Sequence, residues 1–185
     1  MIKIATAECF THGKIGREIH ALAQNYNGNF GRDYIINPLE YGNFDYSSIS
    51  VICSLFIPTI NAVKSILQVK NIPEPLELIK GIKVYNEEQD LEVAKIMASS
   101  VKSITCSDLA IGTTAGIGRG GIAIISDDFE ILTTSNVYAD LRKNDSECLF
   151  KRQQSGIKKA LDILLLALNN NYSKINKMKN VYIKK

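Results

Sequence analysis

The sequence predicts a three-layer α/β domain with a mixed central sheet, on three observations. A short apolar strand, a polar loop and an amphipathic helix follow one another over residues 2–23. Two strand-like segments joined by an Asp-Asp turn predict a hairpin over residues 121–134. Strand and helix patterns alternate along the rest of the chain, and this alternation is typical of a sheet covered by helices on both faces.

The amino-terminal segment predicts the first strand–loop–helix unit. Residues 2–7 form the strand, and the polar residues 8–14 form the loop. Apolar residues then recur at helical spacing over residues 15–23, which predicts an amphipathic helix. The turn-forming sequence at residues 25–29 is expected to end that helix.

The middle of the chain carries two more predicted strands and two predicted helices. Residues 34–37 and 50–56 have strand character, and the second run is nearly continuous in apolar side chains. Such a run is typical of a central strand covered on both faces. Proline suits the first turn of a helix, so a helix is expected to start at Pro58. Two acids open the helix predicted over residues 87–101.

The last third predicts a strand end, the hairpin and two helices. Residues 109–112 end a strand, and residues 121–126 and 130–134 form the hairpin. Residues 136–142 predict a short helix, and residues 151–169 a long one with one apolar face.

Length and composition indicate an ordinary globular domain. The chain has 185 residues, of which 45% are hydrophobic and 22% charged. These values exclude disordered, collagen-like and coiled-coil classes as descriptions of the whole chain. We therefore expect one α/β domain over residues 1–173, and its glycine-rich segment 112–121 suggests that this domain binds nucleotides.

The net charge of +3 arises from the carboxyl-terminal end. Five lysines and no acids lie in residues 174–185, so the remaining chain is slightly acidic. This segment is expected to be a solvated, frayed basic tail. A nucleic-acid partner is not expected, because a basic face with interleaved aromatics is missing. The longest apolar run contains Asp162, and no signal peptide is evident, so a cytoplasmic protein without membrane contact is expected.

Four cysteines are expected to be free thiols, because no CxxC pair occurs and their spacing is not that of a disulfide framework. Cys53 lies inside an apolar strand and is interpreted as a packing residue. Cys106 and Cys148 are interpreted as incidental. Cys9 is the candidate nucleophile.

The first candidate site is the loop between the first strand and the first helix, which holds Cys9. Open α/β sheets bind ligands at the carboxyl ends of their strands, and a helix amino terminus stabilises a thiolate. His12 could transfer a proton, and Lys14 adds positive charge. The same cluster contains the candidate ligand-binding residues Thr6, Glu8 and Thr11. The alternative is a packed cysteine beside a capping threonine; zinc is disfavoured because no second close ligand pair follows.

The second candidate site is the glycine-rich segment 112–121. Its glycines permit close approach of a ligand to the backbone, and its amides and hydroxyls suit phosphate or carboxylate oxygens. The candidate ligand-binding residues are Thr113, Thr114, Gly116, Gly118 and Arg119. A strand pattern rather than a helix follows, so the segment is neither a dinucleotide fingerprint nor a P-loop. The alternative is a flexible hairpin connection.

The third candidate site is the polar run Thr134, Ser135 and Asn136, at the expected start of a helix. Helix capping is the ordinary explanation of such residues, and recognition of a ribose or base edge is the alternative. The acids of the chain are scattered and predict no metal site.

Three segments resemble the HcgF family, proteins of methanogenic archaea that take part in making the iron-guanylylpyridinol (FeGP) cofactor of [Fe]-hydrogenase. They are residues 5–20 (ATAECFTHGKIGREIH), 112–120 (GTTAGIGRG) and 133–142 (TTSNVYADLR). The first is the most specific, and the resemblance covers nearly the whole chain.

The resemblance implies a particular chemistry. The family binds guanylylpyridinol, whose carboxylate is activated as an adenylate by a partner enzyme, HcgE, and a cysteine then takes the acyl group as a thioester. That cysteine matches Cys9. The family fold resembles inosine-triphosphate pyrophosphatases and is often dimeric, which implies a homodimer and no permanently bound cofactor. We expect the guanosine to lie over the glycine-rich segment and residues 133–136.

Two other functions stay open. A nucleoside-triphosphate pyrophosphatase of the same fold would need a carboxylate cluster for magnesium. A non-catalytic nucleotide-binding protein would only deliver its ligand.

Overall fold

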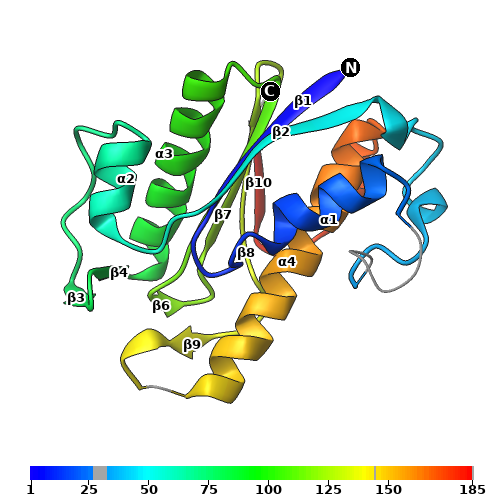
Figure 1. The fold of residues 1–185 in the computed structure, drawn as a ribbon. Coiled ribbons are helices and arrows are strands. Elements are labelled where there is room, and N and C mark those ends of the chain that lie inside the picture. The colour runs from blue at the N-terminus through cyan, green and yellow to red at the C-terminus, as the bar shows by residue number, and fades with distance from the viewer. Residues whose placement is uncertain (27–32, 144, 185) are drawn as a thin grey trace.

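A six-stranded mixed sheet forms the centre of the computed structural model, which describes residues 1–26, 33–143 and 145–184 (Figure 1). Its strand order is β10-β8-β7-β5-β1-β2. In chain order these strands are β1 (Ile2–Glu8), β2 (Ile49–Phe56), β5 (Leu109–Thr114), β7 (Gly121–Ser126), β8 (Glu130–Thr134) and β10 (Val181–Lys184). β1 runs parallel to both β2 and β5, whereas β7, β8 and β10 continue the sheet in antiparallel pairs.

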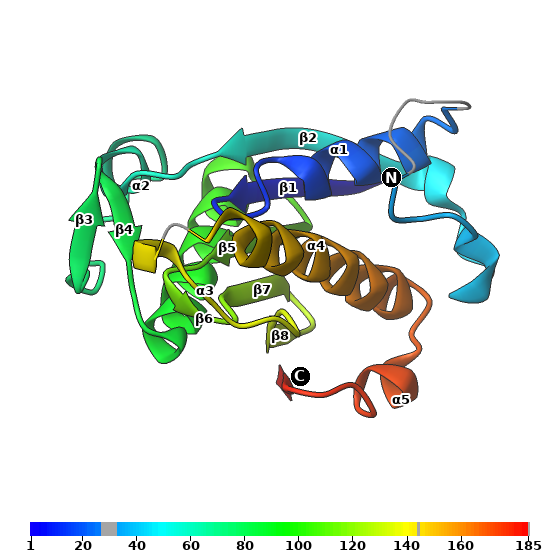
Figure 2. The ribbon, with the colours of Figure 1, turned by 90° about the horizontal axis from the view of Figure 1, so that it is seen from below.

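Helices cover both faces of the sheet. α2 (Ile60–Ile66) and α3 (Glu87–Thr105) lie on one side, and α1 (Lys14–Ala23) and α4 (Ser146–Leu168) on the other, as Figures 1 and 2 show. The strands alternate accordingly: Ile122 and Ile124 join the core beneath α1 and α4, whereas Ala123 faces α3. Small side chains on one face allow α3 to approach closely, and large ones fill the wider space on the other. The predicted three-layer α/β architecture with a mixed sheet is confirmed.

Short elements surround the end of the sheet where β1 runs into α1 (Figure 1). β3 (Glu77–Ile79) and β4 (Ile82–Val84) form a hairpin, and β6 (Ile117–Gly118) pairs with β9 (Ala139–Asp140). The remaining elements are α5 (Tyr172–Ile175) and the 3-10 turns Pro38–Glu40, Tyr46–Ser48 and Leu141–Lys143.

Several predicted elements are confirmed. The hairpin strands have the predicted bounds, and the first strand–loop–helix unit is β1 and α1. α3 begins at a reciprocal cap between Asn86 and Gln89 and continues to Thr105. α4 starts earlier than predicted, because Asp145 caps it through the Cys148 amide. The turn predicted at residues 25–29 lies partly outside the described residues.

Three predicted elements are wrong. Residues 34–37 form no strand, and residues 136–142 form β9 and a 3-10 turn instead of a helix. β2 is an edge strand rather than a central one, so Ile52 and Phe56 are 41% and 52% exposed. A continuous apolar run was misleading here, because one side of the strand meets no neighbour.

The carboxyl-terminal segment also differs from the expected frayed tail. Residues 181–184 pair with β8 as the last strand of the sheet, and Ile175 is fully buried. Val181 and Ile183 pack against the core, while Tyr182 and Lys184 are exposed. The alternation of apolar and polar residues outweighs the lysine content, because a strand needs only one apolar face. In the part of the chain that is described, no helix is long and apolar enough to cross a membrane.

Candidate functional site

The loop that carries Cys9 connects the carboxyl end of β1 to α1. Its backbone turns sharply at His12 and Gly13, whose φ angles are 54° and 76°. The Cys9 amide donates to both the carbonyl oxygen and the hydroxyl of Thr113, at 2.9 and 3.2 Å. That hydroxyl lies 2.8 Å from the hydroxyl of Thr11. β5 therefore holds the loop that β1 presents.

The buried carboxylate of Glu8 holds this loop in place through hydrogen bonds. Glu8 has no exposed surface and accepts four hydrogen bonds. The Gly16 and Ile15 amides donate at 2.8 and 3.1 Å, and the Thr11 and Thr6 hydroxyls at 2.7 and 2.9 Å. Burial raises the pKa of Glu8, although the four hydrogen bonds oppose the rise. Glu8 thus caps α1 from the preceding strand.

This capping changes the role expected of the helix terminus. Glu8 takes the second and third amides of α1, while the Lys14 amide donates to the Thr11 carbonyl and the Arg17 amide to the Gly13 carbonyl. The amides of the first turn are therefore already occupied. They are not available to a thiolate or an oxyanion at Cys9, contrary to the expectation from sequence.

Cys9 lines a cavity of about 380 Å³ between the loop, the β2–α2 connection, β4 and α4. Most of the lining is apolar, and Phe10, Phe56, Leu149 and Phe150 contribute to it. Its polar members are Cys9, His12, Ser146, Arg152 and Gln153. The thiol is 6% exposed and donates to the carbonyl oxygen of Pro58 at 3.9 Å. A mostly apolar cavity with few convergent polar groups is typical of a small-molecule site.

The structure brings His12 to the same cavity as Cys9. The imidazole is tilted against the Phe56 ring, with 4.9 Å between the ring centroids. Burial, with a smaller contribution from the nearby Lys14 charge, lowers the pKa of His12. The imidazole is therefore neutral at neutral pH and can accept a proton.

Arg152 is a cavity residue that sequence reasoning missed. Its side chain is buried, and Nη1 donates to the carbonyl oxygens of Gly116, Gly118 and Ala139 at 3.0, 3.0 and 2.9 Å. Its Nε has no hydrogen-bond partner among the described residues. The neighbouring Gln153 donates to the Phe10 carbonyl at 2.9 Å and so ties α4 to the Cys9 loop.

A signal for Arg152 was present in the sequence. The buried face of α4 includes Gly156 and Ile163, which lie four and eleven positions after Arg152. An arginine at the inward register of an amphipathic helix is unusual unless it is paired or functional.

The glycine-rich segment approaches protein backbone rather than open space. A Cβ on Gly112 would stand 2.1 Å from the Ala94 carbonyl oxygen of α3, and a Cβ on Gly116 would stand 2.3 Å from the Tyr85 amide nitrogen. These glycines let α3 and the Tyr85 backbone lie directly against the sheet. Thr114 is buried within the same contact, and its hydroxyl has no hydrogen-bond partner in the described part of the chain.

The amides of this segment are also engaged. The Gly116 amide donates to the Asp90 carboxylate at 2.8 Å, and the Arg119 amide donates to Glu87 at 2.8 Å. The Arg119 guanidinium makes two further hydrogen bonds to Glu87. Burial raises the pKa of Asp90 to about 7. The phosphate cradle expected from the glycine pattern is thus filled by carboxylates of α3.

The third predicted site lies apart from the cavity lining. Thr134 and Ser135 are buried, the Asn136 amide donates to the Ser155 hydroxyl at 2.9 Å, and its side chain accepts from Lys159 at 3.4 Å. These contacts join β8 to the middle of α4. Since no helix starts here, the capping interpretation is wrong, and recognition of a ribose or base edge stays a prediction.

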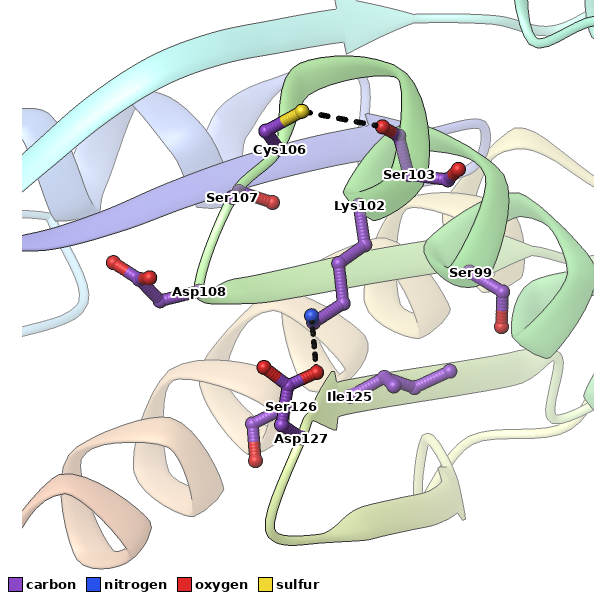
Figure 3. Close-up of a pocket in the computed structure, with 9 residues that line it drawn as sticks. All are labelled: Ser99, Lys102, Ser103, Cys106, Ser107, Asp108, Ile125, Ser126 and Asp127. Atoms are coloured by element: carbon purple, nitrogen blue, oxygen red, sulfur yellow. Dashed lines mark hydrogen bonds and ion pairs between the residues drawn. The ribbon is translucent and has the colours of Figure 1, made fainter.

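A second cavity, of about 460 Å³, lies at the opposite end of β5 (Figure 3). Asp108, which precedes β5, and the exposed Cys106 line it, and Lys102 forms an ion pair with Asp127 across it at 2.7 Å. It contains none of the sequence-predicted site residues. No group of three or more His, Cys, Asp or Glu residues is arranged to hold a metal ion within the described ranges.

Comparison with known proteins identifies the family. The family model of the FeGP cofactor biosynthesis protein HcgF matches residues 1–168. A UPF0254 protein of Methanothermobacter thermautotrophicus (strain Delta H) is 47% identical over 89% of this chain and 97% of its own length. UPF0254 proteins of Methanopyrus kandleri and Methanococcus maripaludis (strain C6) are 45% and 43% identical, over 87% and 93% of this chain and 85% and 98% of their own. A match over most of the chain, with relatives of this identity, shows that the chain belongs to the HcgF family of FeGP cofactor biosynthesis proteins.

Proposed function

We propose that this chain forms a thioester between Cys9 and the carboxyl group of guanylylpyridinol during FeGP cofactor biosynthesis. The observation that carries the proposal is the position of Cys9 in the wall of a largely apolar cavity, beside a neutral imidazole and a buried guanidinium. Apolar walls suit the aromatic pyridinol end of this ligand, and the buried cation suits a carboxyl oxygen.

The proposed reaction starts from the adenylate of guanylylpyridinol, made by an HcgE-type partner. The Cys9 sulfur attacks the acyl carbon, a sulfur–carbon bond forms, and the bond from that carbon to the adenylate oxygen breaks. AMP leaves with the bonding electron pair. The thiol proton passes to His12, whose imidazole is free to accept it because its pKa is lowered. No oxidant or metal takes part in this step.

Mass spectrometry of the whole protein tests the proposal. After incubation with guanylylpyridinol, ATP and the adenylating partner, we expect one covalent adduct, mapped to Cys9 and removed by hydroxylamine. Cys9→Ser should carry none. Cys106→Ser is the matched control, because Cys106 is the exposed thiol and lies in the other cavity; its adduct should be unchanged. An adduct on Cys106, or none at all, would refute the assignment.

Two further measurements separate the alternatives. Release of pyrophosphate from inosine triphosphate by this chain alone would support a pyrophosphatase, and binding of guanylylpyridinol without an adduct would support a non-catalytic carrier. The likeness of the fold to inosine-triphosphate pyrophosphatases and the homodimer stay predictions. Sedimentation of the purified protein tests the second of them.

A further inference from the structure

A fully buried lysine lies behind the wall of the Cys9 cavity. Lys83, on β4, has no exposed surface, and its Nζ donates to the carbonyl oxygens of Pro58 and Ile57 at 3.3 and 3.5 Å. In the described part of the chain, no carboxylate lies within ion-pair distance of this ammonium. Its neighbours are neutral carbonyls, so its positive charge is not cancelled by a direct partner.

Lys83 and Cys9 share one acceptor. The Cys9 thiol donates to the same Pro58 carbonyl oxygen that accepts from Lys83, at 3.9 Å. The sulfur and the ammonium nitrogen are therefore within about 7 Å of each other, close enough for a substantial interaction in a medium of low polarity. When the thiol loses its proton, the Pro58 carbonyl keeps its lysine donor and is not left unsatisfied.

The other source of stabilisation expected for a thiolate is missing. Glu8 and loop carbonyls occupy the first amides of α1. Other groups therefore matter for a Cys9 thiolate, among them the side-chain charges around the cavity. These are Glu8, His12 and Lys14 on its own segment, Lys83 on β4, Asp90 on α3 and Arg152 on α4.

These groups differ in their effect on the Cys9 sulfur. The His12 imidazole is neutral at neutral pH, and Glu8 directs its carboxylate to α1 and two threonines. Burial lowers the pKa of Arg152, and negative charge on Asp90 and on the Cys9 sulfur opposes this shift, so Arg152 interacts with the sulfur. Asp90 interacts with both Arg152 and Lys83 and offsets part of their charge.

We propose that Lys83 is a positioning residue that favours loss of the Cys9 thiol proton, acting across the shared Pro58 carbonyl. The inference rests on Cys9 being the nucleophile of the proposed function. It adds the group that activates Cys9, on an element far from it in sequence.

The test is the pH profile of Cys9 alkylation by iodoacetamide, followed by peptide mass on the full chain. Lys83→Met keeps the length of the side chain and removes its charge, so we expect the midpoint to rise by about one pH unit. Below the midpoint, alkylation should then be about tenfold slower. Lys83→Gln still donates a hydrogen bond to the carbonyl but is neutral, and it should show the same rise. Lys83→Arg should restore the wild-type midpoint.

Lys159→Met is the matched control. Lys159 is also buried and donates to a backbone carbonyl, that of Lys179 at 2.7 Å, but Cys9 donates to a different carbonyl, that of Pro58. The control should leave the profile unchanged. A wild-type midpoint in either neutral Lys83 variant, or an equal rise in the control, would overturn the inference; if Lys83→Met does not fold, Lys83→Gln decides.

Iodoacetamide needs neither guanylylpyridinol nor the partner enzyme, so the two proposals fail separately. A raised midpoint without an acyl adduct would refute the thioester and leave the role of Lys83 intact.

Discussion

Replacing Asp90 by asparagine should remove a large pH dependence from the stability of this protein. Asp90 lies under the Gly116 amide, and one of its carboxylate oxygens has no hydrogen-bond partner among the described residues. Burial raises its pKa from 3.8 to about 7. A carboxyl group with a raised pKa in the fold favours folding fully below the unfolded pKa, and this stability is lost as pH rises through the folded pKa.

The magnitude follows from the pKa shift. A rise of about three units corresponds to about 4 kcal/mol of free energy of unfolding that is lost by the time Asp90 is fully ionised. Asparagine mimics the protonated carboxyl: it accepts from the Gly116 amide and can donate to the Thr114 hydroxyl, which has no partner of its own within the described ranges. The advantage of Asp90→Asn over wild type should therefore grow by about 2.5 kcal/mol between about pH 5 and about pH 8.

Denaturant unfolding at several pH values measures this difference. Comparing two pH values cancels any constant cost of the substitution. Asp127→Asn is the control, because the Asp127 side chain is 87% exposed; it should leave the pH dependence nearly unchanged. If Asp90→Asn and wild type showed equal pH dependence, the pKa of Asp90 would not be raised in the folded protein, and this prediction would be wrong.

Three further changes test the packing around the site. Arg152→Lys should lower the free energy of unfolding by about 2–3 kcal/mol in denaturant titrations, because a lysine ammonium lacks the planar fork of N–H donors with which the guanidinium holds these loop carbonyls. Gly112→Ala should cost at least about 2 kcal/mol by the same measurement, because its Cβ would collide with the Ala94 carbonyl oxygen. Gly13→Ala is the control, because a Cβ at Gly13 would meet open space. It should lower the free energy of unfolding by only about 1 kcal/mol, the cost of alanine in a left-handed backbone conformation. Deleting residues 180–185 should lower the melting temperature and raise light scattering, because β8 becomes an unpaired edge.

Each of these outcomes has a contrary result. An Arg152→Lys protein as stable as wild type would show that the guanidinium does not anchor the loop. If Gly112→Ala and Gly13→Ala lowered the free energy of unfolding equally, close packing of α3 against Gly112 would not explain the cost. If the deletion changed neither the melting temperature nor the light scattering, the carboxyl-terminal strand would not contribute to the stability of the sheet.

Local patterns predicted the elements whose neighbours are close in sequence. The β1–α1 unit, the β7–β8 hairpin and α3 depend on turn chemistry, caps and periodicity, and these signals lie within a few residues of the element. The place of a strand in a sheet is a long-range property. The sequence predicted that β2 is a central strand, but it lies at the edge of the sheet. The sequence also predicted that the residues of β10 form a frayed tail, but they form a strand of the sheet.

The candidate site divides in the same way. Cys9 and His12 could be predicted, because the loop after a first strand and before a helix is a short-range pattern. The same pattern predicted Thr6, Glu8 and Thr11 as ligand-binding residues, and the glycine-rich segment predicted Thr113. In the structure these four residues hydrogen-bond to one another beneath the loop and hold it. Arg152 and Lys83 come from α4 and β4, and their local sequence does not show that they meet Cys9.

By itself, the sequence determined the fold class, the free-thiol chemistry and the segments that mark the family, because these follow from periodicity, composition and short motifs. Only the tertiary structure decided which charges surround Cys9. The Glu8 carboxylate caps the α1 terminus, Arg152 of α4 lines the Cys9 cavity, and Lys83 of β4 shares the Pro58 carbonyl with Cys9. The physical reason is that the electrostatic environment of a buried sulfur is set by groups within several ångströms in space, wherever they stand along the chain.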